Sequence, residues 1–364
     1  MKDCGSKKLV FLFLAVVFTL TLASAASAQP GEFVKGVLQP LADGFPKHAI
    51  TIIVVDDPGT RDGLYARSLQ ASCKGISPVN IVVSDEPVQN GGTFDKIKDL
   101  RTREGNNDGY YPIVGSVFGP VTDLLTDPIS DRLKMGPDDL SYVICTDMLS
   151  RCFVQRKNAP WGPTFDGMVK YSKANPGKLK YISSGVGSGG DIATHAVMRE
   201  TGITAKKIPM NSYEQIASTI GAGEGDFGMI WTEVAYTHWQ AGKIDVTLFL
   251  GADKVPPPWD KDPNVVTRIG GASDASGTFF RSLGVHLGLL VPKEVPKAHI
   301  DWMFKLFKAA ASTDQHRMRE KTVPGDRIII IDPDEANATK MDLYNKFDPI
   351  TRSLGMHWEQ QKKK

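Results

Sequence analysis

Residues 49–67 read AITIIVVDDPGTRDGLYAR, a stretch in which a strand, a turn and a helix follow one another directly. The run Ala49–Val55 is continuously apolar and mostly β-branched, which is typical of a strand buried on both faces of a parallel sheet. The polar turn Asp56–Gly63 contains proline and glycine, and a helix is predicted from Leu64 to about Lys74. Together these elements predict an α/β fold.

The alternation of strand and helix continues along the rest of the chain. The further predicted strands are Val79–Val83, Tyr110–Gly115, Leu179–Ser183, Lys206–Pro209, Asp226–Ile230, Val246–Leu250 and Leu283–Val291, with a hairpin at Tyr142–Arg156. The further predicted helices are Thr93–Glu104, Phe165–Asn175, Asp191–Thr201, Tyr213–Ala222, Glu233–Ala241, Lys297–Arg319 and Glu335–Leu354, and the predicted loops are Gln29–Lys47 and Ala252–Gly277. This rhythm predicts right-handed crossovers and open sheets covered on both faces.

Residues 1–28 have the features of a secretory signal peptide. Lys2, Lys7 and Lys8 precede the apolar run Leu9–Leu22, and Ala26-Ser27-Ala28 supplies a small-residue cleavage pattern. The alternative is an uncleaved membrane anchor, but this run is shorter than the roughly 20 residues of a membrane-spanning helix. We therefore expect cleavage near Gln29 and a soluble protein in the periplasm. The residues that remain exceed what one core usually serves, which favours two lobes.

The charge balance excludes some partners. The chain has 43 basic and 41 acidic residues, and residues 1–28 hold three of the basic and one of the acidic residues. The remaining chain is therefore close to neutral. It has no basic stripe of the kind that a phosphate backbone requires, so we expect no nucleic-acid partner.

The cysteines leave two readings open. Cys73 is predicted to be a buried thiol on a helix. Cys145 and Cys152 either form a disulfide across a short hairpin or are two buried free thiols. No cysteine or histidine has metal-ligand spacing, and Asp56 and Asp57 fit a turn better than a metal site. We expect no metal and no cofactor.

Three turns lie between a strand and a helix, at Asp57–Gly63, Gly185–Gly190 and Trp231–Glu233. In open α/β sheets the carboxyl ends of the strands border the ligand site. The helix that follows offers free backbone N–H groups, which favour an anion. Taken singly, each turn is more often a plain connection, but their recurrence favours two turns that clamp a carboxylate.

Signatures of enzymes are missing from the sequence. Ser188 has Val186 two residues before it, where a nucleophile elbow requires glycine. The glycines of Gly185–Gly190 lack the dinucleotide-binding spacing, and the seven histidines are scattered singly. We expect that the protein is not an enzyme.

Several segments resemble one known family, the substrate-binding receptors of tripartite tricarboxylate transporters, also called Bug receptors. The matching segments are Ile50–Arg67, Lys173–Tyr181 with Gly185–Ser188, Gly223–Asp226, Ala241–Lys243 and Gly288–Pro292. The resemblance implies a type II periplasmic binding protein, with two α/β lobes joined by crossing hinge strands and a ligand between them. We expect lobe one at residues 29–145 and 280–364, and lobe two at residues 146–279.

The resemblance also implies the ligand-binding residues. These are Pro58, Gly59, Thr60, Arg61 and Asp62 in the first lobe, Ser188, Gly189 and Gly190 in the second, and Trp231, Thr232 and Glu233 as a third wall. Ser188 and the backbone after it are expected to hold one ligand carboxylate. Trp231 is either an apolar wall for the ligand or a packed hinge residue.

Arg61 stands where the family has glycine. A guanidinium grips a carboxylate with two parallel hydrogen bonds, which favours a ligand with a second anionic group. The alternative is that Arg61 pairs with Asp57, Asp62 or solvent.

The resemblance implies a monomeric receptor that captures a small carboxylate, such as a dicarboxylate or an amino acid, and delivers it to membrane transporter subunits. Two alternatives are a solute sensor for a signalling partner and a periplasmic hydrolase.

Overall fold

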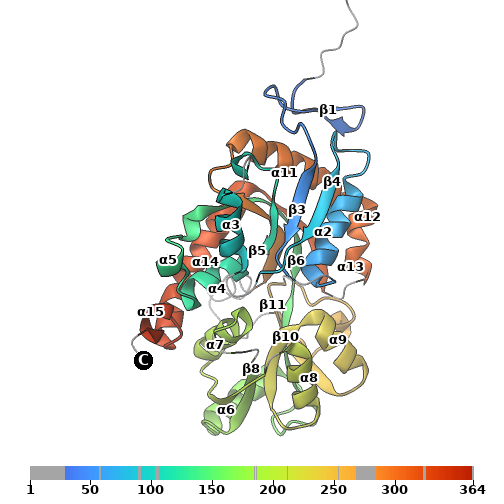
Figure 1. Cartoon of the computed structure of the whole chain (residues 1–364). Helices are drawn as coiled ribbons and strands as arrows, with labels where there is room; N and C mark the ends of the chain where they lie inside the picture. Colours follow the sequence, from blue (N-terminus) through green and yellow to red (C-terminus); the bar gives the residue numbers. More distant parts are fainter. Residues whose placement is uncertain are drawn as a thin grey trace, which may run out of the picture.

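The chain folds around two sheets, one above the other in the view of Figure 1. The computed structural model describes residues 29–56, 59–88, 92–102, 106–183, 185, 187–210, 212–252, 254–267, 284–322 and 325–362. The predicted signal peptide lies outside the described residues. Over those ranges, none of the helices combines the length and the apolar character that crossing a bilayer requires.

In the described residues, the first sheet has six strands in the order β4-β3-β5-β12-β6-β13. Its strands are β3 (Ile50–Val54), β4 (Ile81–Asp85), β5 (Ile113–Ser116), β6 (Leu140–Leu149), β12 (Val285–Pro292) and β13 (Asp326–Ile331). Strand β3 is parallel to β4 and β5, whereas β12 is antiparallel to β5 and β6. Ile50, Ile52, Ile53 and Val54 have no exposed surface. The buried parallel strand predicted at residues 49–55 is therefore confirmed.

Helices from distant parts of the chain cover this sheet. They are α2 (Arg61–Ser72), α3 (Gly92–Thr102), α4 (Phe118–Thr126), α11 (Lys297–Ala311) and α14 (Pro333–Ser353). Because α11 and α14 both pack on β6, the last quarter of the chain completes the lobe that β3 begins.

The second sheet has five strands among the described residues, in the order β11-β7-β10-β8-β9. Its strands are β7 (Arg151–Arg156), β8 (Leu179–Ser183), β9 (Ala205–Pro209), β10 (Phe227–Trp231) and β11 (Ile244–Leu250). Its helices are α6 (Phe165–Ala174), α7 (Gly189–Thr201), α8 (Tyr213–Gly221) and α9 (Thr232–Gln240). In Figure 1, α7 lies on the side of this lobe that faces the first sheet.

The chain crosses between the sheets at Ser150. Strand β6 pairs with β12 and β13, and β7 pairs with β10 and β11, so the hairpin predicted at Tyr142–Arg156 is wrong. The sequence shows two apolar strands with a polar break, and this pattern does not distinguish a hairpin from a crossing. Cys145 and Cys152 therefore belong to different sheets, and both are buried free thiols, as is Cys73.

The return crossing brings two glycines together. A Cβ atom on Gly251 would lie 2.1 Å from the Cα atom of Gly284, so the two backbones touch. The predicted lobes were residues 29–145 with 280–364 and residues 146–279. With these sheets as support, we propose the same two lobes with the first boundary moved to Ser150, because residues 146–149 belong to β6 of the first sheet.

Other elements differ from expectation. The helix predicted at Lys297–Arg319 is broken into α11, α12 (Asp314–Arg317) and α13 (Arg319–Thr322), because the Thr313 side chain caps a new helix start. The predicted loop at Gln29–Lys47 contains a small hairpin, in which β1 (Phe33–Val34) pairs with β2 (Val37–Leu38). Helix α4 and strand β13 were not predicted.

Candidate ligand-binding site

The first residue of β7, Arg151, is a buried cation between two aromatic rings. Arg151 is only 5% exposed. Its Cζ atom lies 4.7 Å from the centre of the Phe118 ring and 4.6 Å from the centre of the Trp231 ring. Its Nη1 donates a hydrogen bond of 3.4 Å to the Gly189 carbonyl, and its Nε has no hydrogen-bond partner within the described residues. Two aromatic rings thus lie close to the guanidinium, and one of its N–H groups is left without a partner among the described residues.

No carboxylate of the described residues forms an ion pair with Arg151. Burial lowers the pKa of the Arg151 guanidinium to about 10, and the positive charge of Arg61 acts in the same direction. The group therefore stays charged at neutral pH. A buried cation without a counter-ion favours the approach of an anion.

Arg61 approaches the same tryptophan from the first lobe. It is the first residue of α2, and its Cζ lies 4.2 Å from the centre of the Trp231 ring. Among the described residues, the carboxylate oxygens paired with it belong to Asp62, at 3.7 Å from Nε, and to Glu233, at 3.8 Å from Nη1. Both distances exceed hydrogen-bond length, and Nε has no hydrogen-bond partner within the described residues. The predicted partner Asp62 is thus close to Arg61 without a hydrogen bond to it, and so is Glu233, which was not predicted as a partner of Arg61.

The turn before α2 supplies one more unused polar atom. Thr60 occupies the N-cap position, yet its side chain makes no capping hydrogen bond, and its buried Oγ1 has no partner in the part of the chain that the structure describes. Gly59 has φ of +86°, a left-handed conformation that favours glycine. Pro58, and with it Asp57, lies outside the described residues.

The turn at Gly185–Gly190 is organised by a buried aspartate. Ser188 is the N-cap of α7, where its Oγ accepts a 3.2 Å hydrogen bond from the backbone N–H of Asp191 and donates to the Gly185 carbonyl. The fully buried Asp191 carboxylate accepts from the Tyr181 and Ser183 hydroxyls and pairs with Lys207. The geometry gives Ser188 a capping role, and its contact with a ligand stays a prediction.

The two glycines that follow allow close packing. A Cβ atom on Gly189 would lie 3.0 Å from the Phe118 ring and 3.3 Å from Arg151 Nη2. Gly190 is buried, and its carbonyl accepts a hydrogen bond from the Thr194 hydroxyl. Gly189 therefore belongs to the wall around Arg151.

The three residues predicted as the third wall of the site, Trp231, Thr232 and Glu233, have different roles in the structure. Trp231 ends β10 and contacts both arginines, and Glu233 lies in the first turn of α9 beside Arg61. The Thr232 hydroxyl is buried and donates to the Ser150 carbonyl at the crossing. Thr232 thus fastens α9 to the hinge.

The structure brings together Arg61, Trp231, Glu233 and Gly189 from the predicted set and adds Arg151 and Phe118, which the sequence analysis missed. The sequence did contain one signal for Arg151, because this charged residue directly precedes the apolar run Cys152–Val154. A charge at the edge of a buried strand requires a partner or a function.

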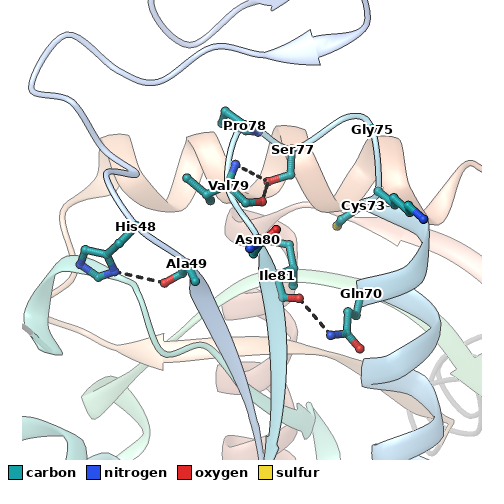
Figure 2. A pocket seen from close by; sticks show the side chains of 11 residues that line it. His48, Ala49, Gln70, Cys73, Gly75, Ser77, Pro78, Val79, Asn80 and Ile81 are labelled. Carbon is teal, nitrogen blue, oxygen red and sulfur yellow. Dashed lines mark hydrogen bonds between the residues drawn. The ribbon is translucent and has the colours of Figure 1, made fainter.

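A pocket of about 610 Å³ lies at the amino ends of β3 and β4. Figure 2 shows the side chains that line it. Gln70 Nε2 donates to the Ile81 carbonyl at 3.0 Å, and the Ser77 hydroxyl donates to the Val79 carbonyl at 2.7 Å. Burial raises the pKa of the Cys73 thiol in its wall to about 12. Ligand sites of open α/β sheets lie at the opposite, carboxyl ends of the strands, so we do not assign the ligand to this cavity.

A hydrogen-bonded chain runs from Ser68 through His316 to Asp147. Ser68 Oγ lies 2.9 Å from His316 Nδ1, and His316 Nε2 lies 2.8 Å from Asp147 Oδ1. The residue types follow the order of a hydrolase triad, but the two ring nitrogens are exchanged, because in the triad Nε2 faces the serine. His316 is fully buried, however, and Asp147 also pairs with Arg319. A buried imidazole has no access to a substrate, so these residues fix β6 in place.

Comparison with known proteins gives consistent matches. Residues 80–315 match the family model of the tripartite tricarboxylate transporter family receptor. A curated relative, a UPF0065 protein of Bordetella pertussis, is 22% identical over 349 residues, which cover 95% of this chain and 98% of the relative.

Solved structures share the fold. A TctC solute binding protein from Polaromonas has a TM-score of 0.68 at 17% identity, with 85% of this chain and 99% of that chain covered. MatC from Rhodopseudomonas palustris with bound malate has a TM-score of 0.58 at 18% identity, with 84% and 99% covered. R. palustris Rpa4515 with adipate has a TM-score of 0.61 at 16% identity, with 85% and 98% covered.

The likeness to these structures confirms the predicted fold of a periplasmic binding protein with two α/β lobes. The family match covers more than half of the chain. This chain belongs to the tripartite tricarboxylate transporter family of receptors.

Proposed function

We propose that this receptor captures a small carboxylate between its lobes, with Arg151 as the anchor of the ligand. The observation that carries the proposal is the uncompensated charge of Arg151. Taking an ion out of water costs several kcal/mol unless a partner compensates it. A carboxylate at the guanidinium edge supplies that partner through charge-assisted hydrogen bonds.

The two arginines of the site support a ligand with two carboxylates. Phe118, Trp231 and Gly189 lie close to Arg151, and Arg61 lies close to the same tryptophan. The relatives MatC and Rpa4515 were solved with malate and adipate, which both carry two carboxylates. We extend this ligand class to the present chain, where Arg61 is the candidate partner of a second carboxylate.

The remaining predicted residues keep supporting roles in this proposal. Gly59 and Thr60 precede α2, Asp62 lies in its first turn, and Ser188, Gly189 and Gly190 lie at the start of α7. Pro58 comes before Gly59 in the sequence. Thr232 holds the hinge. Backbone N–H groups at the two helix starts favour the negative ligand.

We further propose that the protein is exported, is cleaved after Ala28 and acts in the periplasm as a monomer. It would pass its ligand to the membrane subunits of a tripartite tricarboxylate-type transporter rather than transform it. Family membership supports transport over the alternative of a solute sensor, and the burial of His316 argues against a hydrolase.

Thermal-shift measurements and calorimetry on the mature protein test this function. The panel consists of mono- and dicarboxylates of two to six carbons with the matching amino acids. A ligand at 100 times its dissociation constant adds about 2.7 kcal/mol of stability. Binding of a carboxylate that is lost in Arg151→Gln supports the proposal. Equal binding by wild type and variant refutes Arg151 as the anchor.

A further inference from the structure

Two cations and one carboxylate meet at Trp231, and their arrangement is not symmetrical. The Cζ atoms of Arg61 and Arg151 lie 4.2 and 4.6 Å from the same ring centre, so at most 8.8 Å separates them. Arg151 has no carboxylate partner among the described residues, whereas Arg61 has Glu233 at 3.8 Å. Only Arg61 therefore has a built-in acidic neighbour from the opposite lobe.

The contact between Arg61 and Glu233 is loose enough to be replaced. Its 3.8 Å separation is longer than a hydrogen bond, and the side chains are 27% and 36% exposed. Ion pairs with this exposure stabilise proteins little. In addition, Arg61 Nε is buried and has no hydrogen-bond partner in the described part of the chain. A ligand carboxylate offers Arg61 the short hydrogen bonds that Glu233 does not make.

We infer that Glu233 is a specificity-determining residue that competes with the second carboxylate of a ligand for Arg61. This inference rests on the proposed function, because the first carboxylate must be held at Arg151. A monocarboxylate occupies Arg151 alone and leaves Arg61 beside Glu233. A short dicarboxylate reaches both guanidiniums and displaces Glu233, whose negative charge weakens its binding.

The competition also links the lobes. Arg61 belongs to α2 of the first lobe, while Trp231 and Glu233 belong to β10 and α9 of the second. When the site is empty, Glu233 therefore lies beside Arg61 in place of the ligand carboxylate. Removal of the Glu233 charge frees Arg61 for the ligand.

The test compares butanoate with butanedioate, and hexanoate with hexanedioate, by calorimetry on the mature protein. Glu233→Gln is expected to raise affinity for the better dicarboxylate up to about fivefold, the range of an exposed ion pair, and to leave the monocarboxylate of equal length unchanged. Arg61→Gln is expected to lower the affinity for the dicarboxylate to that for the monocarboxylate of equal length. Glu224→Gln removes an exposed charge elsewhere in lobe two and is expected to change neither.

Other outcomes separate this inference from the proposed function. If Arg151→Gln abolishes both ligand types while Glu233→Gln has no effect, only the inference is overturned. If Glu233→Gln instead weakens the binding of 4-aminobutanoate, Glu233 binds the ammonium group of the ligand and does not compete with a ligand carboxylate for Arg61. If the wild type binds no carboxylate of the panel, the proposed function and the inference both fail. Melting temperatures of all variants show that each protein is folded.

Discussion

Arg151 and Arg156 lie on one strand and have opposite surroundings. Arg156 Nε donates to Asp226 at 2.8 Å, whereas Arg151 is buried and pairs with no described carboxylate. A charged pair contributes to stability, but an unpaired buried charge opposes folding. The same substitution is therefore expected to have different effects at the two positions.

Arg151→Gln is expected to leave the melting temperature of the empty protein unchanged or raised, and to weaken carboxylate binding by about 2–5 kcal/mol. Arg156→Gln, the matched control, should lower the melting temperature and keep the affinity. Calorimetry and thermal unfolding measure both quantities. A fall in stability without loss of affinity in Arg151→Gln would show that this arginine is structural.

Ser188 allows a second test, which distinguishes a role in helix capping from a role in ligand binding. As a helix N-cap, it should lose about 1 kcal/mol of stability on substitution by alanine and only a few tenths on substitution by glycine. If the hydroxyl also binds the ligand, both variants should lose affinity equally, by about 1.5–3 kcal/mol. Denaturant unfolding and calorimetry on Ser188→Ala and Ser188→Gly distinguish the two roles. Unchanged affinity in both variants would remove Ser188 from the site.

At the scale of residues, the sequence predicted part of the site. Arg61, Trp231 and Glu233 were placed in the site because they follow strand ends, and the structure brings them together. Phe118 and Arg151 were missed because their role depends on contacts between segments far apart in the chain. No local pattern contains such contacts.

Among the elements, β6, α13 and β13 are tied together by a buried charge network. Arg319 lies 2.6 Å from one Asp147 oxygen and 3.0 Å from an Asp326 oxygen, and His316 contacts Asp147 as well. Burial raises the pKa of Asp326 to about 7, and the Asp147 carboxylate acts in the same direction. Asp326 is therefore the carboxyl group of this network that stays protonated to a higher pH than an ordinary aspartate.

This preference makes stability depend on pH. The folded pKa of Asp326 is raised above its value of 3.8 in an unfolded chain, so its contribution is complete below about pH 4 and is lost as the pH rises through about 7. Asp326→Asn should match wild type near pH 4 and exceed its unfolding free energy at pH 8.

The matched control is Asp301→Asn, which removes an exposed carboxylate paired with Lys297. It should change the unfolding free energy by less than about 1 kcal/mol at every pH. Denaturant titrations at pH 4 to 8 measure both variants. A constant difference between Asp326→Asn and wild type would show that Asp326 is ionised throughout this range.

At the scale of elements, most strands and helices were predicted within a few residues, as at β8, which spans the predicted Leu179–Ser183. Apolar periodicity fixes such elements locally. Their pairing was harder, because β6 and β7 resemble the arms of a hairpin and join different sheets instead. Strand β13 was missed although Ile328–Ile331 is a continuous β-branched run like the one that predicted β3.

At the scale of the whole molecule, export is the prediction that depends least on the fold. The basic head, the apolar run and Ala26-Ser27-Ala28 predict an N-terminus at or near Gln29. Mass spectrometry of periplasmic protein should find this N-terminus, and substitution of Ala28 by a large residue should slow cleavage. Soluble periplasmic protein that retains Met1 would contradict the prediction.

The rates at which the three buried thiols react with a thiol reagent report how often the surrounding structure opens. Burial raises the pKa values of Cys73, Cys145 and Cys152, so these groups are protonated and inaccessible at neutral pH. A thiol reagent can modify them only when the surrounding structure opens. Because Cys145 lies in the first sheet and Cys152 in the second, labelling rates of single-cysteine proteins report the opening of each lobe separately. A ligand that clamps both lobes should slow the two rates together, whereas one held by a single lobe should slow only its own.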